Sequence, residues 1–210
     1  MLGDTALSDT GLTSIHIPGT CKEIKNYCFL RTEFLTSITL EEGIETIGAE
    51  AFQGSGLSGH VEIPGSVQGI ATALFKNSNI SSLKVNEGTS ILYYGAFNMM
   101  TSLQSLDLPS TITSIGNNYN GLYNNQTGYA FAWNPNLTSI TCRAVTPPTL
   151  ISGTTGGIAS NFIRVQDDTA TYLYNSTPYC YLYVPAGSVA AYKAATGWSA
   201  FGDKILPIPS

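Results

Sequence analysis

The chain has 210 residues, of which 43% are hydrophobic and 11% are charged, and its formal net charge is −5 at neutral pH. An acidic balance with so few cations excludes the basic surface of a nucleic-acid-binding protein. No apolar run is long enough to cross a membrane, so membrane insertion is not expected, and the first residues do not resemble a signal peptide.

A unit of 22 or 23 residues recurs along most of the chain, and residues 35–56, LTSITLEEGIETIGAEAFQGSG, are one clear copy. The copies align on the residue that ends a short alternating run, and these anchor residues are Pro18, Glu41, Pro64, Asn86, Pro109, Arg143 and Pro185. One and three positions before the anchor every copy is apolar, which is the period-2 pattern of a half-buried strand. We therefore expect short parallel strands that stack from copy to copy.

The second half of each unit ends in a phenylalanine, eleven positions after the anchor. These residues are Phe29, Phe52, Phe75 and Phe97, and Phe131 joins them once an insertion is removed. The preceding small or apolar residue and the following Gly, Asn or Ser favour one short helical or 3-10 turn. No single unit can bury its own apolar face, so stacked units should share one core. The predicted fold is a repeat solenoid.

The first part of the solenoid is predicted to span residues 1–145. Residues 5–12 match the end of a copy, so the chain should begin inside a repeat, without a polar capping unit, and we interpret it as a piece of a longer protein. An uncapped repeat presents an edge that favours end-to-end self-association. The third copy carries one extra residue, which predicts a bulge near Gly56 and Gly59.

The fifth copy is interrupted by eleven extra residues in the run NNYNGLYNNQTGY. Insertions in repeats form loops, often on a binding face, and Tyr and Asn suit adaptable recognition surfaces. Tyr119 and Tyr123 are therefore candidate ligand contacts.

Residues 146–178 break the period and are expected to form an irregular insertion, which could contain a hairpin between residues 162 and 174. Residues 179–210 should restore one strand and then form a C-terminal cap, in one continuous domain. Ser188 is placed to cap a short helix that ends at Gly197. Four apolar residues of the tail should then fold back over the last strand: Trp198, Phe201, Ile205 and Ile208.

The four cysteines do not indicate a metal site. Cys21, Cys28 and Cys142 occupy apolar columns, where a free cysteine acts as a small hydrophobe. A disulfide between Cys142 and Cys180 is conceivable, although Cys142 should point into the core. With two histidines and no Cys-x-x-Cys pair, neither a zinc site nor any other cofactor is expected.

The repeat consensus, LxxIxLPxxIxxIGxxAFxxC/N, resembles the BspA-type leucine-rich repeats of bacterial surface proteins. The ending LYVPAGSVAAYKAATGWSAFGDKILPI is similar to the closing segment of such proteins from Bacteroidetes. This resemblance covers nearly all of the chain outside residues 146–178. It implies a right-handed leucine-rich-repeat solenoid, an extracellular or cell-surface location, and adhesion to or binding of macromolecules. It implies no catalytic residues.

Two columns of side chains in the strands must face away from the core. Four members, on three successive strands, are expected to form a mixed polar patch: His60, Glu62, Lys84 and Asp107. Tyr181 and Tyr183 should form an aromatic end to the same face. The alternative is a bare solvated sheet, which would also carry polar side chains.

Three functions compete on this evidence. The first is a non-enzymatic module that binds a protein or a glycan through the polar columns, the Tyr/Asn loop, or both. The second is a structural spacer that displays other domains of a longer surface protein. Exposed tyrosines favour binding and buried ones favour a spacer. An enzyme is the least supported, because a glycoside hydrolase needs two facing carboxylates and the columns offer Glu62 and Asp107 with Lys84 between them.

Overall fold

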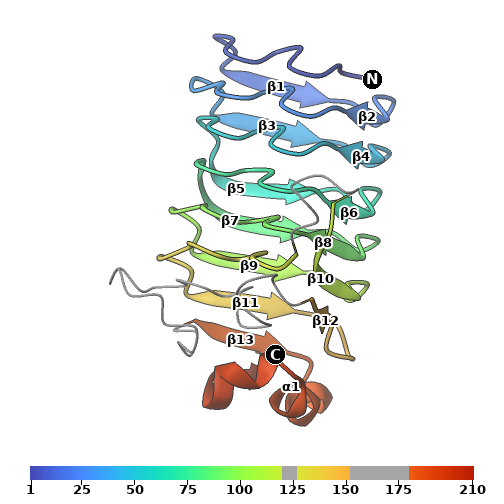
Figure 1. Cartoon of the computed structure of the whole chain (residues 1–210), viewed down its shortest axis with the longest axis vertical. Coiled ribbons are helices and arrows are strands. Elements are labelled where there is room, and N and C mark those ends of the chain that lie inside the picture. The colour runs from blue at the N-terminus through green and yellow to red at the C-terminus, as the bar shows by residue number, and fades with distance from the viewer. Residues whose placement is uncertain (120–126, 152–179) are drawn as a thin grey trace.

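The computed structural model describes residues 1–119, 127–151 and 180–210. Figure 1 shows a stack of rungs that runs from the N-terminus at one end to a small helical cap at the other. The predicted hairpin between residues 162 and 174 lies outside the described residues, as does Tyr123. Within the described ranges, no helix has the length and apolar character needed to cross a membrane.

One long-strand face carries one strand from each rung, and every hydrogen-bonded pair of strands on it is parallel. Its strands are β1 (Ser14–Ile17), β3 (Ser37–Leu40), β5 (Ser58–Ile63), β7 (Asn79–Val85), β9 (Ser105–Leu108), β11 (Ser139–Cys142), β13 (Tyr181–Val184) and β14 (Ile205–Pro207). The predicted apolar columns are in register, with Val61 opposite Leu83 and Leu83 opposite Leu106. The predicted solenoid of short parallel strands is confirmed.

A second series of short strands follows the anchors. It comprises β2 (Glu23–Ile24), β4 (Thr46–Ile47), β6 (Gly69–Ile70), β8 (Ile91–Tyr93), β10 (Ser114–Asn117) and β12 (Thr149–Leu150). Strand β12 pairs with β10, with Leu150 opposite Ile115. The regular array therefore continues past residue 145, where the sequence pattern placed its end. The sequence does not predict β12, because a Pro-Pro pair directly precedes it and proline is untypical of a strand.

The extra residue of the third copy produces the predicted bulge. Gly59 has φ 72°, and the register between β5 and β7 shifts between Gly59 and His60. The long-strand face is divided at this place, with β1 and β3 forming a two-stranded sheet and β5 belonging to a six-stranded one.

The phenylalanine column is stacked as predicted over Phe29, Phe52 and Phe75, and again over Phe97 and Phe131. The ring centres of Phe29 and Phe52 lie 4.9 Å apart, those of Phe52 and Phe75 5.5 Å, and those of Phe97 and Phe131 6.5 Å. All five rings are fully buried. Because each stacked pair brings together rings from two successive rungs, the stacking joins neighbouring rungs.

The turn around each phenylalanine differs from the expected helical turn. Tyr27 and Arg31, two residues before and after Phe29, have left-handed φ values of 58° and 54°. The N–H groups of all three donate to carbonyl oxygens of the next rung, while the N–H of Leu30 closes a turn onto the carbonyl of Tyr27. In a helix these N–H groups would donate to carbonyl groups of the same turn. Here every second N–H donates to the next rung, so no helix forms.

The C-terminal cap contains η3 (Ala186–Ser188), α1 (Val189–Ala194) and η4 (Trp198–Lys204). Trp198 and Phe201 are buried, as predicted. Ser188 precedes α1 but its side chain makes no capping hydrogen bond, so the predicted cap is wrong in that detail. The tail also adds β14, a further parallel strand in which Ile205 lies opposite Leu182.

The cysteines are free thiols. Cys142 points into the core, as expected, and lies 3.2 Å from the hydroxyl oxygen of Tyr192. Burial raises the pKa of the Cys180 thiol to about 12, so this thiol is protonated and unreactive at neutral pH.

Candidate functional site

The candidate site lies on the outward side of the long-strand face. Strand pairing places His60 opposite Ser82, Glu62 opposite Lys84, and Lys84 opposite Asp107. The four residues of the predicted polar patch are therefore neighbours on three successive strands. Side chains directly opposite one another on adjacent strands are close enough to interact.

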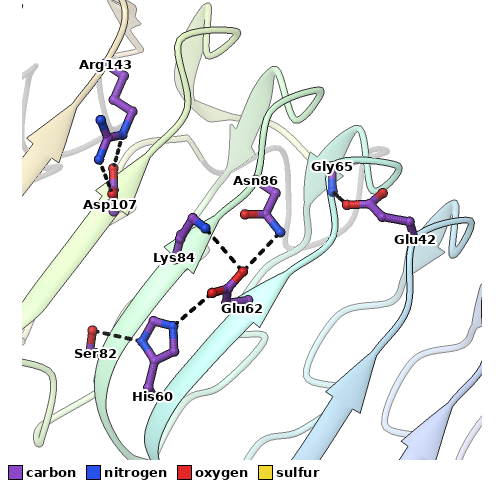
Figure 2. Close-up of polar contacts among 9 residues, drawn as sticks. All are labelled: Glu42, His60, Glu62, Gly65, Ser82, Lys84, Asn86, Asp107 and Arg143. Atoms are coloured by element: carbon purple, nitrogen blue, oxygen red, sulfur yellow. Dashed lines mark hydrogen bonds and ion pairs between the residues drawn. The ribbon is translucent and has the colours of Figure 1, made fainter.

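Glu62 is the centre of the first group of contacts, which Figure 2 shows. Its carboxylate lies 3.3 Å from Nε2 of His60, 3.3 Å from Nζ of Lys84 and 3.3 Å from Nδ2 of Asn86. A carboxylate only accepts hydrogen bonds, so Nε2 of His60 carries a proton. Nδ1 of His60 lies 3.1 Å from the hydroxyl of Ser82. The histidine ring is thus oriented from both nitrogens.

The pKa of the Glu62 carboxyl is held below its ordinary value. The largest cause is the hydrogen bond from His60, and bonds from Lys84 and Asn86 add to it, while partial burial opposes the shift. Glu62 is therefore ionised at neutral pH, and it is a poor candidate for a general acid.

Asp107 is bound by Arg143, which lies one rung further along (Figure 2). Nε and Nη2 of Arg143 donate to the two carboxylate oxygens at 2.9 and 2.7 Å. Such a bidentate pair fixes the orientation of both side chains. The sequence pattern does not identify Arg143 and Asn86 as partners in the patch, because both occupy anchor positions, which mark only the ends of strands.

A common geometry explains these anchor contacts. The backbone N–H of Arg143 donates to the carbonyl of Leu108 in the preceding rung, and its side chain reaches Asp107 beside it. Glu41, another non-proline anchor, makes the same backbone bond to Ile17, and its carboxylate lies 3.0 Å from Nε2 of His16.

Asn86 follows the same rule, with its N–H on the carbonyl of Ile63 and its side chain on Glu62. A proline anchor has no N–H to donate. A sequence signal for these partners does exist. It is a polar residue at the anchor of one rung, combined with an ionisable residue in the preceding rung, two positions before the anchor of that preceding rung.

The residue after the anchor links rungs in the opposite direction. The carboxylate of Glu42 accepts hydrogen bonds from the N–H groups of Gly65 and Ser66, at 2.8 and 3.0 Å. Glu87 accepts bonds from the N–H and the hydroxyl of Ser110, at 2.9 and 2.8 Å. These carboxylates have structural roles, and they satisfy N–H groups at turns that no strand pairs.

A shallow depression of about 250 Å³ lies beside these pairs on the long-strand face. It is lined by His60, Ser82, Leu83, Lys84, Ser105, Leu106, Asp107, Ser139 and Thr141. The predicted aromatic end adjoins it, because Tyr181 lies opposite Ser139 and Tyr183 lies opposite Thr141. The two tyrosine rings are 6.3 Å apart and 27° from parallel, and Tyr181 is 47% exposed.

Tyr119 lies elsewhere. Its ring packs edge-on against Tyr93 of β8, with centres 5.0 Å apart, and it borders a separate hollow with Glu23, Thr46 and Gly48. These neighbours belong to the short strands and to the loops around them. The insertion therefore starts along the short-strand side, and Tyr119 does not join the polar patch.

The chemistry that the depression offers is hydrogen bonding and aromatic stacking. Among the described residues, no group of three or more His, Cys, Asp or Glu side chains could hold a metal ion. The two carboxylates nearest the depression, Glu62 and Asp107, are each held by cations.

Solved structures similar to this chain come from bacterial proteins, two of which are described as leucine-rich. A leucine-rich repeat protein from Bacteroides ovatus is 18% identical, with a TM-score of 0.36, over 70% of this chain and 45% of that one. The pneumococcal vaccine antigen PcpA is 12% identical, with a TM-score of 0.36, over 99% of this chain and 70% of that one. A leucine-rich cell surface protein from Faecalibacterium prausnitzii is 15% identical, with a TM-score of 0.34, over 95% and 60%.

This chain thus spans less than half the length of the Bacteroides ovatus protein. No curated protein matches it. The family model for the BspA-type leucine-rich repeat region matches residues 1–127 in six copies. That match covers the same columns whose register the strands display, and the chain belongs to the BspA-type leucine-rich repeat family.

Proposed function

We propose that this chain is a non-enzymatic binding module of a secreted or cell-surface bacterial protein, and that it recognises a macromolecule through its long-strand face. The observation that carries the proposal is the juxtaposition of the exposed Tyr181 with the polar depression, through its register with Ser139. A partly exposed aromatic ring beside oriented polar groups is typical of recognition surfaces. The extracellular location rests on the family.

The proposed binding function is also supported by the fixed orientation of the polar side chains. Glu62 and Asp107 are fixed by partners on neighbouring rungs, so little side-chain entropy remains to be lost when a ligand binds. The rungs themselves are joined by backbone bonds and by the phenylalanine stack. Such a preorganised, solvent-facing surface suits a binding module.

The competing function is a spacer that displays other domains. One observation favours it: Tyr119, which binding through the inserted loop would need exposed, is half buried against Tyr93. The burial of Tyr119 counts against the inserted loop as the binding site, whereas the exposure of Tyr181 supports the long-strand face.

The test is a binding screen of the purified chain against host matrix proteins and a glycan array, repeated with two variants. Tyr181→Ala/Tyr183→Ala removes the aromatic end of the long-strand face, and Tyr119→Ala removes the ring on the short-strand side. We expect a ligand whose binding is weakened by the first variant and unchanged by the second. A ligand lost only with Tyr119→Ala would move the site to the short-strand side, and the absence of any ligand would favour the spacer.

A further inference from the structure

We propose that the ligand of the long-strand face is an uncharged glycan chain, bound across the strands in the depression with its end stacked on Tyr181 and Tyr183. This proposal rests on the proposed function, namely that this face binds a macromolecule. It goes further by choosing the chemical class of the ligand from the charges, hydroxyls and rings on the face.

The charges around the depression compensate one another. Lys84 pairs with Glu62 at 3.3 Å, and Asp107 is held in the bidentate pair with Arg143. His60 is bound through both ring nitrogens. A polyanion or a basic segment would meet charges that their partners already compensate, so it would gain little net electrostatic attraction on this face. The face therefore favours a ligand without charge.

Hydroxyl groups on the floor of the depression are available to such a ligand. Ser105, Ser139 and Thr141 line it and are half buried, and their hydroxyls make no hydrogen bond in the part of the chain that the structure describes. A hydroxyl can both donate and accept, which matches it to the hydroxyls of a sugar. A charged group of a ligand would bind an ionised side chain more strongly than these neutral hydroxyls.

The hydroxyls recur at the spacing of the rungs. Ser82, Ser105 and Ser139 lie opposite one another on adjacent strands, which are about 4.8 Å apart in a sheet. An extended chain that lies across the strands meets one hydroxyl at each rung. A periodic ligand, such as a polysaccharide, can use every one of these positions in the same way.

The tyrosine pair extends this row by one rung. Tyr181 lies opposite Ser139 and Tyr183 lies opposite Thr141, so the rings directly follow the hydroxyls. The face of an aromatic ring is negative and attracts the weakly positive C–H groups that cover one face of a sugar ring. A surface that combines hydroxyls with an aromatic platform fits both sides of a pyranose.

A protein ligand fits the depression less well. Protein interfaces are centred on large apolar or arginine side chains that enter well-packed pockets. Here seven of the nine residues that line the depression are polar, the arginine is engaged with Asp107, and the depression is shallow. Binding of a protein remains the alternative outcome of the test.

The experiment measures affinity for soluble neutral polysaccharides (β-glucan, xylan, mannan and galactan), for two acidic ones (polygalacturonate and hyaluronan) and for matrix proteins. We expect at least one neutral polysaccharide to bind, and Tyr181→Ala to weaken that binding roughly tenfold. Ser139→Ala/Thr141→Val should weaken it about fivefold by removing two hydroxyls. Phe34→Ala is the matched control, because Phe34 is an exposed aromatic residue 66% accessible to solvent and outside the depression.

The salt dependence separates the ligand classes. Affinity for a neutral polysaccharide should stay within about twofold up to about 1 M salt, where charge interactions are screened beyond a few ångströms. Affinity for an acidic polymer would fall steeply. Binding of acidic polymers alone overturns the proposal that the ligand is uncharged.

Two further outcomes distinguish this proposal from the function on which it rests. A matrix protein that binds, and loses affinity with Tyr181→Ala, while no polysaccharide binds, overturns the glycan proposal and keeps the long-strand face as the binding site. Neutral polysaccharide binding that neither face variant changes overturns the assigned site. Absence of all binding, in a chain whose fold is verified by circular dichroism, contradicts both.

Discussion

The guanidinium group of Arg143 donates hydrogen bonds to both carboxylate oxygens of Asp107, at 2.9 and 2.7 Å, although the two residues are 36 positions apart in the chain. The contact exists because Arg143 takes the anchor position of its rung, where its own N–H already bonds to the preceding rung. A residue that breaks the proline pattern of the repeat therefore serves as a clasp between rungs. The same position is used by Glu41 and Asn86.

The Arg143–Asp107 clasp should give a small but measurable coupling energy. Both side chains are partly exposed, so we expect a coupling of about 0.5–1 kcal/mol from a double-mutant cycle of Arg143→Ala and Asp107→Ala in urea unfolding. Arg143→Lys should retain only part of it, because lysine lacks the planar fork. A coupling indistinguishable from zero would mean that the pair orients the side chains without stabilising the fold.

Phe52 should be one of the most important residues for stability, because it stacks on Phe29 on one side and on Phe75 on the other. Phe52→Ala leaves a cavity that spans neighbouring rungs, and we expect a loss of about 3–5 kcal/mol in the free energy of unfolding. Phe34→Ala, at an exposed phenylalanine, should change it by less than about 0.5 kcal/mol. Similar losses in the two variants would contradict a stack that holds the rungs together.

Gly65 is required by the close approach of two rungs. A Cβ atom at this position would lie 1.7 Å from the carbonyl oxygen of Glu87 in the next rung. Gly65→Ala must push the rungs apart, and we expect it to lower the free energy of unfolding by about 2 kcal/mol or more. Gly187→Ala is the control, because its Cβ would meet no atom within 4 Å. Thermal melting compares the two variants. If Gly65→Ala melted at the same temperature as Gly187→Ala, glycine would not be required at position 65.

The Tyr192 hydroxyl should stabilise the C-terminal cap. It donates to the carbonyl oxygen of Ala144 at 2.9 Å, within the core. Tyr192→Phe keeps the ring and leaves this buried carbonyl without its donor, which should cost about 1–2 kcal/mol in the free energy of unfolding. Tyr181→Phe, at an exposed ring, should have no measurable effect on stability. An unchanged unfolding midpoint in Tyr192→Phe would show that water or another donor replaces the hydroxyl.

The interactions of Glu62 predict a pH dependence. Because its pKa is lower in the folded chain than the ordinary value of 4.5, ionised Glu62 favours the folded state above that pH. The contribution disappears as the pH falls through the lowered pKa. Glu62→Gln should therefore be slightly less stable than the original chain at pH 7, by less than about 1 kcal/mol, and equally stable in strong acid. A stability difference that does not change with pH would show that the ionised form has no special role.

The repeat pattern alone was sufficient to predict the order of the rungs and the contents of the core. A constant spacing with period-2 alternation leaves one register in which every apolar column is buried, so His60, Glu62 and Lys84 had to become neighbours. The stack of phenylalanines followed for the same reason. These features depend on backbone periodicity, which the sequence carries directly.

Other features were decided by the tertiary structure. Whether the side chains of Asn86 and Arg143 reach the preceding rung depends on side-chain length, on rotamer and on the charge found there, and no local pattern encodes that combination. The turns around Phe29 became ladders of bonds between rungs because the next rung offered carbonyl groups. Strand β14 and the packing of Tyr119 against the short strands likewise depend on segments outside the repeat, whose path is set by the surfaces on which they pack.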